Sequence, residues 1–271
     1  MFELEDRYWW FVARRRLALG LLRKALKGGP GSLGDRAAAG TDSTSGASGC
    51  CAVEAEEAPT PADTRPTVLD LGCGTGVVLR ELGEWASPVG VDMSPVALDF
   101  CRRRGLRHLV AAKGERLPIA EGEIDAVVAL DIVEHIPDDE EAFREVFRAL
   151  RPGGVLVVSV PAFITLWGPH DEALMHKRRY RARQIADLLA GAGFKLERIS
   201  YSIFFLFPVV LIVRLFEKFK RGEPQASLPP VPGWFNRLLI GLQAVEAALI
   251  GRLRLPWGSS VVAVARKPRS G

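Results

Sequence analysis

Several features that define common classes of protein are scarce or absent in this sequence. It has only 4 cysteines in 271 residues, and two of them, Cys50 and Cys51, are adjacent. Such spacing provides neither a disulfide framework nor a cysteine-based metal site. No apolar run reaches the roughly 20 residues of a membrane-spanning helix, and the first residues, MFELEDRYWW, contain early acidic side chains and no apolar signal segment. We therefore expect a cytoplasmic protein.

Composition and charge narrow the class further. With 48% hydrophobic residues, the chain can bury one sizeable core and an attached subdomain. Residues 1–27 carry 7 basic and 3 acidic side chains, and residues 202–271 carry 10 and 3. A basic excess at both ends suits an anionic membrane surface or a phosphorylated substrate. Solvated surface charge is the alternative interpretation.

Changes in composition divide the chain into five parts. We expect an N-terminal amphipathic helix at 1–27, a disordered linker at 28–66, a core at 67–201, an apolar helical insert or lid at 202–256, and the last core strand with a tail at 257–271.

The core alternates apolar runs with amphipathic stretches. TVLDL, PVGVDM, HLVAA, IDAVVAL and GVLVVSV are candidate strands, and helices are expected at 76–84, 94–104, 138–150 and 181–192. Ser94 and Pro95 are a typical helix start. Repeated strand-then-helix units predict a parallel α/β sheet.

A glycine-rich turn follows the first strand, in VLDLGCGTG at 68–76. A dinucleotide fingerprint requires G-x-G-x-x-G, but here Gly76 comes one residue early and Val77 takes the third glycine position. Glycines still let backbone approach a ligand closely. Asp92 closes the second strand, where a carboxylate can accept both ribose hydroxyls of an adenosine. A turn acid or helix cap is the alternative for Asp92.

The ordered segments together resemble the class I S-adenosylmethionine-dependent methyltransferases, close to the type 11 group. The segments that carry the resemblance are VLDLGCGTG, GVDMS, GERLP, IDAVVALDIVEH and LRPGGVLVVSVP. The resemblance implies a Rossmann-like, seven-stranded, mostly parallel sheet with helices on both faces and a helical insert before the antiparallel last strand, SSVVAVARK at 259–267. It also implies S-adenosyl-L-methionine as the cofactor, bound over the carboxyl ends of the strands.

The same resemblance assigns cofactor contacts. The methionine and ribose would lie along Asp70, Gly72, Cys73, Gly74 and Gly76, with Asp92 on the ribose hydroxyls, Met93 on the adenine face, and Leu130 and Asp131 at the methionine side or the substrate mouth. One departure concerns Lys113, which stands where the family commonly has an acid that accepts from the adenine amino group. Because a lysine only donates, adenine recognition would rest on backbone at Gly114 and Glu115.

The segment expected to contact the methyl acceptor follows the fifth strand. Its sequence is PAFITLWGPHDEALMHKRRYRAR, and type 11 relatives place this segment over the substrate. A hydroxyl or amine acceptor needs a general base, and the catalytic candidates are His170, Asp171, His176 and Tyr180. Ordinary loop hydrogen bonds are the alternative. No metal site is expected, because His170, Asp171 and His176 match no familiar spacing. Glu134 and His135 are interpreted as a cap of the next helix.

Basic and aromatic side chains complete the predicted acceptor site. Five basic residues lie at 177–183, and this cluster is consistent with phosphate binding. A solvent-exposed charged surface is the alternative interpretation. Substrate contacts are predicted for Arg178, Arg179, Trp167 and Trp10.

Three apolar, basic-edged pieces are expected outside the core. They are Tyr8 to Phe11 with Arg14 to Arg16, the run IFFLFPVVLIV at 203–213, and residues 234–255. Two interpretations of these pieces remain open: helices that lie in a membrane interface, or a lid that covers the cleft. Either interpretation favours a lipophilic acceptor.

The prediction is therefore a methyltransferase acting on a lipophilic or phosphate-bearing small-molecule or lipid acceptor, peripheral on the inner face of the membrane. The alternative is an inactive, cofactor-binding scaffold at membranes. A nucleic-acid substrate is disfavoured because no Asn-Pro-Pro-Tyr-like or Pro-Cys element follows the fourth strand. The sequence does not fix the oligomeric state.

Overall fold

The computed structural model describes residues 2–28, 65–217 and 230–269. The Cys50–Cys51 pair lies outside the described residues. The predicted linker at 28–66 also lies outside them, except for residues 28, 65 and 66.

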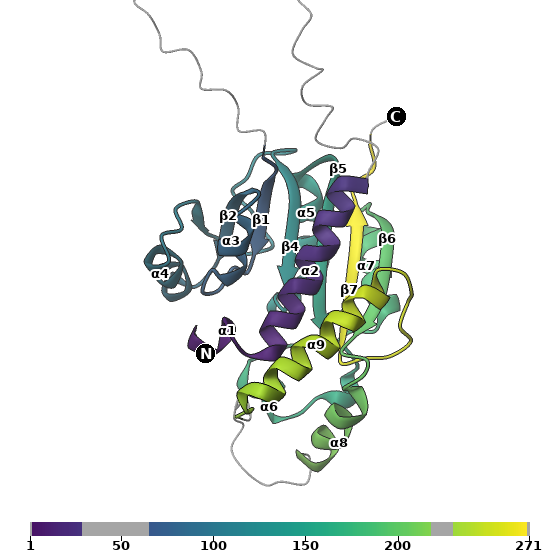
Figure 1. Ribbon diagram of the computed structural model, residues 1–271. Helices are drawn as coiled ribbons and strands as arrows, with labels where there is room; N and C mark the ends of the chain where they lie inside the picture. Colours follow the sequence, from purple (N-terminus) through teal and green to yellow (C-terminus); the bar gives the residue numbers. More distant parts are fainter. Residues whose placement is uncertain (1, 29–64, 218–229, 270–271) are drawn as a thin grey trace, which may run out of the picture.

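Seven strands form one sheet within the described residues, in the order β3-β2-β1-β4-β5-β7-β6 (Figure 1). β1 to β5 pair in parallel, whereas β7 runs antiparallel between β5 and β6. This topology confirms the predicted fold class. The strands are β1 Thr67–Leu71, β2 Ser87–Asp92, β3 Leu109–Ala111, β4 Ile124–Leu130, β5 Leu150–Pro161, β6 Lys195–Ser202 and β7 Ser260–Arg266.

Helices cover both faces of this sheet. In Figure 1, α2 and α9 cross the front face, and α5 and α7 lie behind it. Leu69 packs into the core that contains Phe143 and Ile185, whereas its neighbour Val68 packs into the opposite core with Leu22. The helices are α1 Phe2–Glu5, α2 Trp9–Gly28, α3 Val77–Leu82, α4 Pro95–Arg103, η2 Val133–His135, α5 Asp139–Ala149, η3 Ile164–Leu166, α6 Pro169–Ala173, α7 Ala182–Gly191, α8 Phe207–Glu217 and α9 Gly233–Ile250.

The N-terminal helix is part of the core. Leu22 of α2 is fully buried against the sheet, and Leu19 is 4% exposed. Arg15 is also buried and pairs with Glu81 of α3 at 2.6 Å. The expectation that this segment lies outside the core is therefore wrong, because its leucine stripe has a sheet face to cover.

Two helix starts test the capping predictions. Ser94 caps α4, accepting a hydrogen bond from the Ala97 N–H at 3.3 Å, with Pro95 following. The cap of α5 is Asp138, which accepts from the Glu141 N–H at 2.9 Å. Glu134 and His135 instead lie in the separate turn η2, so their interpretation as a helix cap is wrong.

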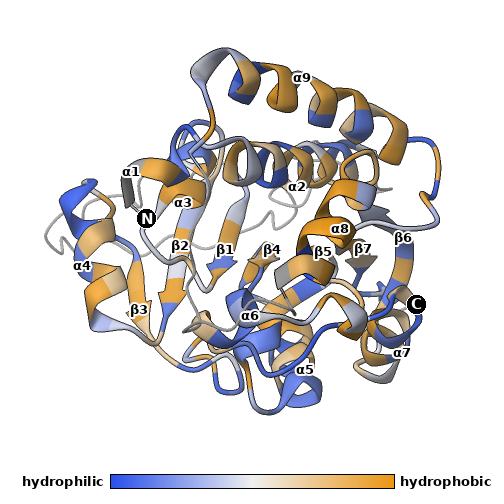
Figure 2. Ribbon diagram, turned by 90° about the horizontal axis from the view of Figure 1, so that it is seen from below, coloured by the Kyte–Doolittle hydropathy of each residue, from blue (hydrophilic) through white to orange (hydrophobic). Residues whose placement is uncertain are grey.

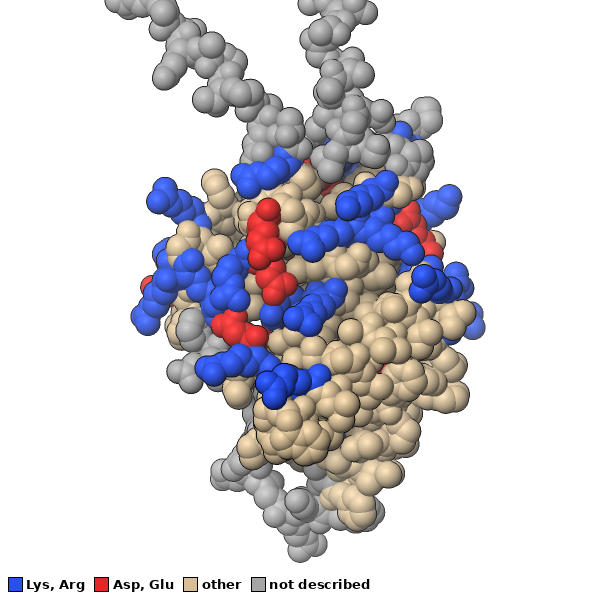
Figure 3. Space-filling model, in the orientation of Figure 1, with Lys and Arg blue, Asp and Glu red and all other residues tan. Residues whose placement is uncertain are grey.

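The predicted insert forms α8 and α9, between β6 and β7. Figure 2 shows α8 as largely hydrophobic, and Figure 3 shows little charge over α8 and the adjoining part of α9. Exposed apolar side chains on these two helices include Val209, Ile212, Val213, Leu215, Phe216, Trp234, Phe235 and Leu238, which we call the α8–α9 apolar surface. Among the described helices, none is both long and apolar enough to cross a bilayer.

Candidate cofactor and acceptor site

The carboxyl ends of β1 and β4 border a cavity of about 120 Å³. The glycine turn after β1 forms one wall, because Gly72, Gly74 and Gly76 all adopt positive φ values of 74°, 52° and 81°. The lining residues are Glu5, Phe11, Arg14, Arg15, Asp70, Gly72, Cys73, Gly74, Thr75, Val77, Val78 and Leu130. Most of the predicted glycine-turn residues therefore share one cavity.

The glycines of this turn differ in what surrounds them. A Cβ on Gly72 would stand 2.5 Å from the Ile132 side chain, and one on Gly76 would stand 2.5 Å from Leu106. A Cβ on Gly74 would meet nothing within 4 Å. Packing thus requires glycine at 72 and 76, whereas Gly74 leaves space beside the turn.

Asp92 connects the turn after β1 with the turn after β2. Its carboxylate accepts hydrogen bonds from the Gly74 N–H at 2.9 Å and from the Ser94 N–H at 2.8 Å. Asp92 is half-buried, and the Met93 side chain beside it is 70% exposed. The carboxylate is therefore fixed at the strand tip, next to an open apolar side chain.

Asp70 is the buried acid of the crevice. It is 2% exposed, and its Oδ2 atom has no hydrogen-bond partner in the described part of the chain. Burial, reinforced by the negative charge of Asp92, raises the pKa of Asp70 to about 7. Asp70 would therefore be stabilised by a positively charged ligand.

The N-terminal helices cover this crevice, in keeping with the lid interpretation of that segment, but the individual contacts were not predicted. Arg14 of α2 forms an ion pair with Asp131, the residue after β4. The Thr75 hydroxyl donates to Glu5 of α1, and Arg80 of α3 pairs with Asp6 at 2.6 Å. Glu5, Phe11 and Arg14 thus join the glycine turn, although they precede Gly72 by 67, 61 and 58 positions in the sequence.

Arg14 lies among acidic groups. Burial lowers the pKa of Arg14 to about 10, opposed by the charges of Glu134, Glu5 and Asp70. It therefore stays cationic at neutral pH, and its Nε has no hydrogen-bond partner among residues 2–28, 65–217 and 230–269.

The remaining predicted cofactor residues lie at the same edge of the sheet. Cys73 and Leu130 are buried, Gly114 is buried beside Ile136 and Leu71, and Glu115 is half-buried. Lys113 is exposed.

Asp171, on the acceptor side, is engaged within the protein. It is fully buried and pairs with Arg179 through both carboxylate oxygens, at 2.7 and 3.0 Å. His176 lies 2.8 Å from the same carboxylate through Nδ1. Burial alone would raise the pKa of Asp171, but the hydrogen bonds from His176 and Arg179 outweigh it and lower the pKa to about 2. Asp171 therefore positions His176 and Arg179, and the interpretation of Asp171 as a proton acceptor is wrong.

Tyr180 and the two arginines also have partners within the protein. The buried Tyr180 hydroxyl donates to Asp139 at 2.8 Å, and burial raises its pKa well above the ordinary range, so Tyr180 is a poor base. Arg178 pairs with the same Asp139 at 2.8 Å. Arg178 and Arg179 are therefore held by partners within the protein, whereas Lys177 and Arg181 of the five-residue basic cluster are exposed. Phosphate binding by this cluster stays a prediction.

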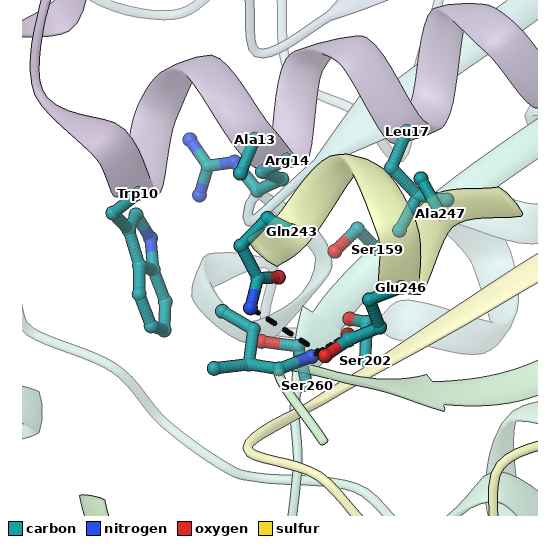
Figure 4. A pocket seen from close by; sticks show the side chains of 11 residues that line it. Trp10, Ala13, Arg14, Leu17, Ser159, Ser202, Gln243, Glu246, Ala247 and Ser260 are labelled. Atoms are coloured by element: carbon teal, nitrogen blue, oxygen red, sulfur yellow. Dashed lines mark hydrogen bonds between the residues drawn. The ribbon is translucent and has the colours of Figure 1, made fainter. Parts of the chain in front are cut away.

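His170, Trp167 and Trp10 are half-buried. Burial, with the nearby charge of Arg214 on α8, lowers the pKa of His170 and so favours its neutral form. Trp10 borders a small cavity of about 10 Å³, in which Gln243 donates to Glu246 at 3.4 Å (Figure 4). This space is too small for an acceptor, and roles for Trp10 and Trp167 stay predictions.

Comparisons with known proteins agree with this geometry. A family profile described as a methyltransferase domain matches residues 69–158. A probable S-adenosylmethionine-dependent methyltransferase of Mycolicibacterium smegmatis is 35% identical over 137 residues, covering 48% of this chain and 52% of that protein. This domain belongs to the class I S-adenosylmethionine-dependent methyltransferases.

Two further matches are a sterol methyltransferase and a solved methyltransferase structure. The methyltransferase domain resembles a sterol 24-C-methyltransferase of Aspergillus fumigatus, 35% identical over 100 residues, covering 34% of this chain and 26% of that protein. A solved methyltransferase from Mesorhizobium loti has a TM-score of 0.52 at 18% identity, covering 74% of this chain and 91% of that one. The chain spans about half the length of the first curated relatives it matches.

The residues present fit S-adenosylmethionine, the cofactor of this class. The open space at Gly74 admits a ligand against bare backbone, and the unpartnered Asp70 oxygen suits a cationic group. The Asp92 carboxylate retains acceptor capacity beyond its two backbone bonds. The fit rests on these three features of the methyltransferase crevice.

Proposed function

We propose that the whole protein transfers a methyl group from S-adenosylmethionine to a lipophilic acceptor. The cofactor supplies an activated methyl electrophile. In this proposal Asp92 binds the ribose hydroxyls, Asp70 faces the cationic end, and Arg14 binds the cofactor carboxylate. The protein then has to align the acceptor and exclude water, which is the main demand of this reaction.

The α8–α9 apolar surface supports a lipophilic acceptor. Val209 is 58% exposed and Phe216 is 67% exposed on α8, and Trp234 is 66% exposed on α9. Several large apolar side chains exposed on two successive helices are typical of surfaces that contact an apolar partner. This is the single observation that carries the acceptor class.

The position of α8 connects this surface with the reaction edge of the sheet. Phe207 at the start of α8 lies 6.0 Å, centroid to centroid, from Phe163, which follows β5. Phe163 in turn stacks on Tyr201 of β6 at 4.8 Å. An apolar acceptor bound along α8 would therefore reach the carboxyl ends of the strands. The similarity to a sterol methyltransferase also favours a lipid acceptor.

We extend the proposal to peripheral contact with the cytoplasmic face of a membrane. Exposed arginines at 252 and 254 follow α9 and complement anionic headgroups, while the apolar surface would enter the interface. α8 would then collect the acceptor from the lipid.

The experiment uses the full chain, methyl-labelled cofactor and a lipid extract. We expect label in the organic phase and a loss of transfer in Val209→Glu and Phe216→Glu. Val96→Glu is the matched control, because Val96 is 66% exposed on α4, away from the insert. Label only in water-soluble products, or equal transfer by all variants, would reject the lipophilic acceptor.

A cofactor-binding scaffold without activity is the second candidate, and Lys113 favours it. Cofactor binding without transfer to any lipid or small-molecule fraction would support the scaffold. Methyl transfer by the unaltered protein to any of these fractions would reject the scaffold.

A further inference from the structure

Glu134 is fully buried, yet its carboxylate lacks a hydrogen bond within the described part of the chain. It is 0% exposed, and neither carboxylate oxygen has a hydrogen-bond partner among the described residues. An isolated buried carboxylate is costly, so this position favours either a proton or a bound cation.

Two imidazole rings face this carboxylate. The Nε2 atom of His176 lies 4.0 Å from Oε1 of Glu134. The rings of His135 and His176 are 4.9 Å apart, centroid to centroid, at an angle of 81°. One potential ligand atom from each of Glu134, His135 and His176 lies within 4.8 Å of the others.

Asp171 fixes the orientation of His176. The Nδ1 atom of His176 lies 2.8 Å from Asp171, whose two oxygens are also held by Arg179. A carboxylate on the second ring nitrogen is the usual support of a metal-binding histidine. The Nδ1 atom is therefore held by Asp171, and the Nε2 atom is directed to the side where Glu134 lies.

We infer that Glu134, His135 and His176 form a binding site for a divalent transition-metal ion. Two imidazoles and one carboxylate are a ligand set of open zinc sites, in which water or a substrate oxygen completes the coordination. Bonds of about 2.1 Å require small rotations of these side chains from their present spacing. The inference does not depend on methyl transfer.

The ligand set differs from the one considered in the sequence. That set combined His176 with His170 and Asp171, but both oxygens of Asp171 are taken up by Arg179. The structure instead brings in the pair after β4, 41 residues before His176 in the chain. Variants at His170 and Glu134 therefore separate the two sets.

The test is a calorimetric titration of the tag-free, metal-free full chain with Zn²⁺. Cys50→Ser and Cys51→Ser are introduced throughout, because adjacent thiols bind zinc themselves. We expect one ion per chain, with affinity reduced at least about tenfold in Glu134→Gln and in His176→Gln. His108→Gln, an exposed histidine on another part of the chain, should bind as the parent does. Mg²⁺ at the same concentration should not compete.

Thermal unfolding separates lost binding from lost folding. Metal-free Glu134→Gln should unfold at or above the parent temperature, because it removes a buried unpaired carboxyl. Added Zn²⁺ should raise the melting temperature of the parent and of His108→Gln, but not of Glu134→Gln. Absence of saturable binding by the parent, undiminished binding in Glu134→Gln, or loss in His170→Gln alone would overturn the inference.

Discussion

Arg14, in the first long helix, forms an ion pair with Asp131, the residue that follows β4. Asp131 has a positive φ of 49° and an Oδ1 atom without a partner. The pair joins a segment that looks peripheral in the sequence to the central strand of the sheet. It also brings a guanidinium group to the crevice that holds the glycine turn.

Replacing Arg14 should weaken cofactor binding. We expect Arg14→Gln to reduce the affinity for S-adenosylhomocysteine roughly 10- to 100-fold, since a hydrogen bond to a charged group contributes about 1.5–3 kcal/mol. Calorimetry measures the effect, with the exposed Arg16→Gln as the control. Equal affinity in both variants would remove Arg14 from the site.

A side chain at position 74 should block the crevice without unfolding the protein. Asn tolerates positive φ, and position 74 has open space around its missing Cβ. We expect Gly74→Asn to abolish cofactor binding while its melting temperature changes little. Gly105→Asn is the matched control, because Gly105 also has positive φ and open space but lies at the end of α4. Intact binding in Gly74→Asn would mean that the ligand lies elsewhere.

Cofactor affinity should depend on pH through Asp70. Its pKa is about 7 in the free protein, and a bound cation would lower it, so binding releases a proton below pH 7. Affinity should then rise with pH, by at most about tenfold per unit, and level off above about pH 7. Calorimetric titrations with the cofactor at pH values from about 5.5 to about 8.5 measure this dependence. Asp70→Asn should flatten the profile, and an unchanged slope in that variant would assign the proton to another group.

The α2 helix should be needed for stability. Leu22 is fully buried against the sheet, so Leu22→Ala should cost about 2–5 kcal/mol in the free energy of unfolding. Leu4→Ala, at a side chain 43% exposed on α1, should change it by no more than about 0.5 kcal/mol. Urea unfolding compares the two variants. Similar small losses would show that α2 is only loosely attached.

The parallel core was predictable because its strands are continuous apolar runs. β4 is buried along its entire length, so IDAVVAL stands out from the helices around it. The edge strand β6 does not, since KLERISYS mixes exposed and buried side chains, and it was absent from the candidate strands. Its place in the sheet follows from pairing with β7, which no local pattern shows.

The geometry around the glycine turn was easier to predict than the hydrogen-bond partners after β5. Glycines and an acid at strand ends carry a local signal, as Gly74 and Asp92 do. The partners of Asp171 and Tyr180 depend instead on how distant elements pack, and Arg14 reaches the crevice only because α2 covers the sheet. Roles that required an unpaired side chain were wrong for Asp171 and Tyr180, because both have hydrogen-bond partners in the folded protein.

A crystal structure of the full chain with S-adenosylhomocysteine tests the central claim most directly. The account predicts the ribose hydroxyls on the Asp92 carboxylate and the homocysteine end against Gly72 and Gly74, below Arg14. A nucleoside bound away from β1 and β2, or a ribose without contact to Asp92, would contradict it.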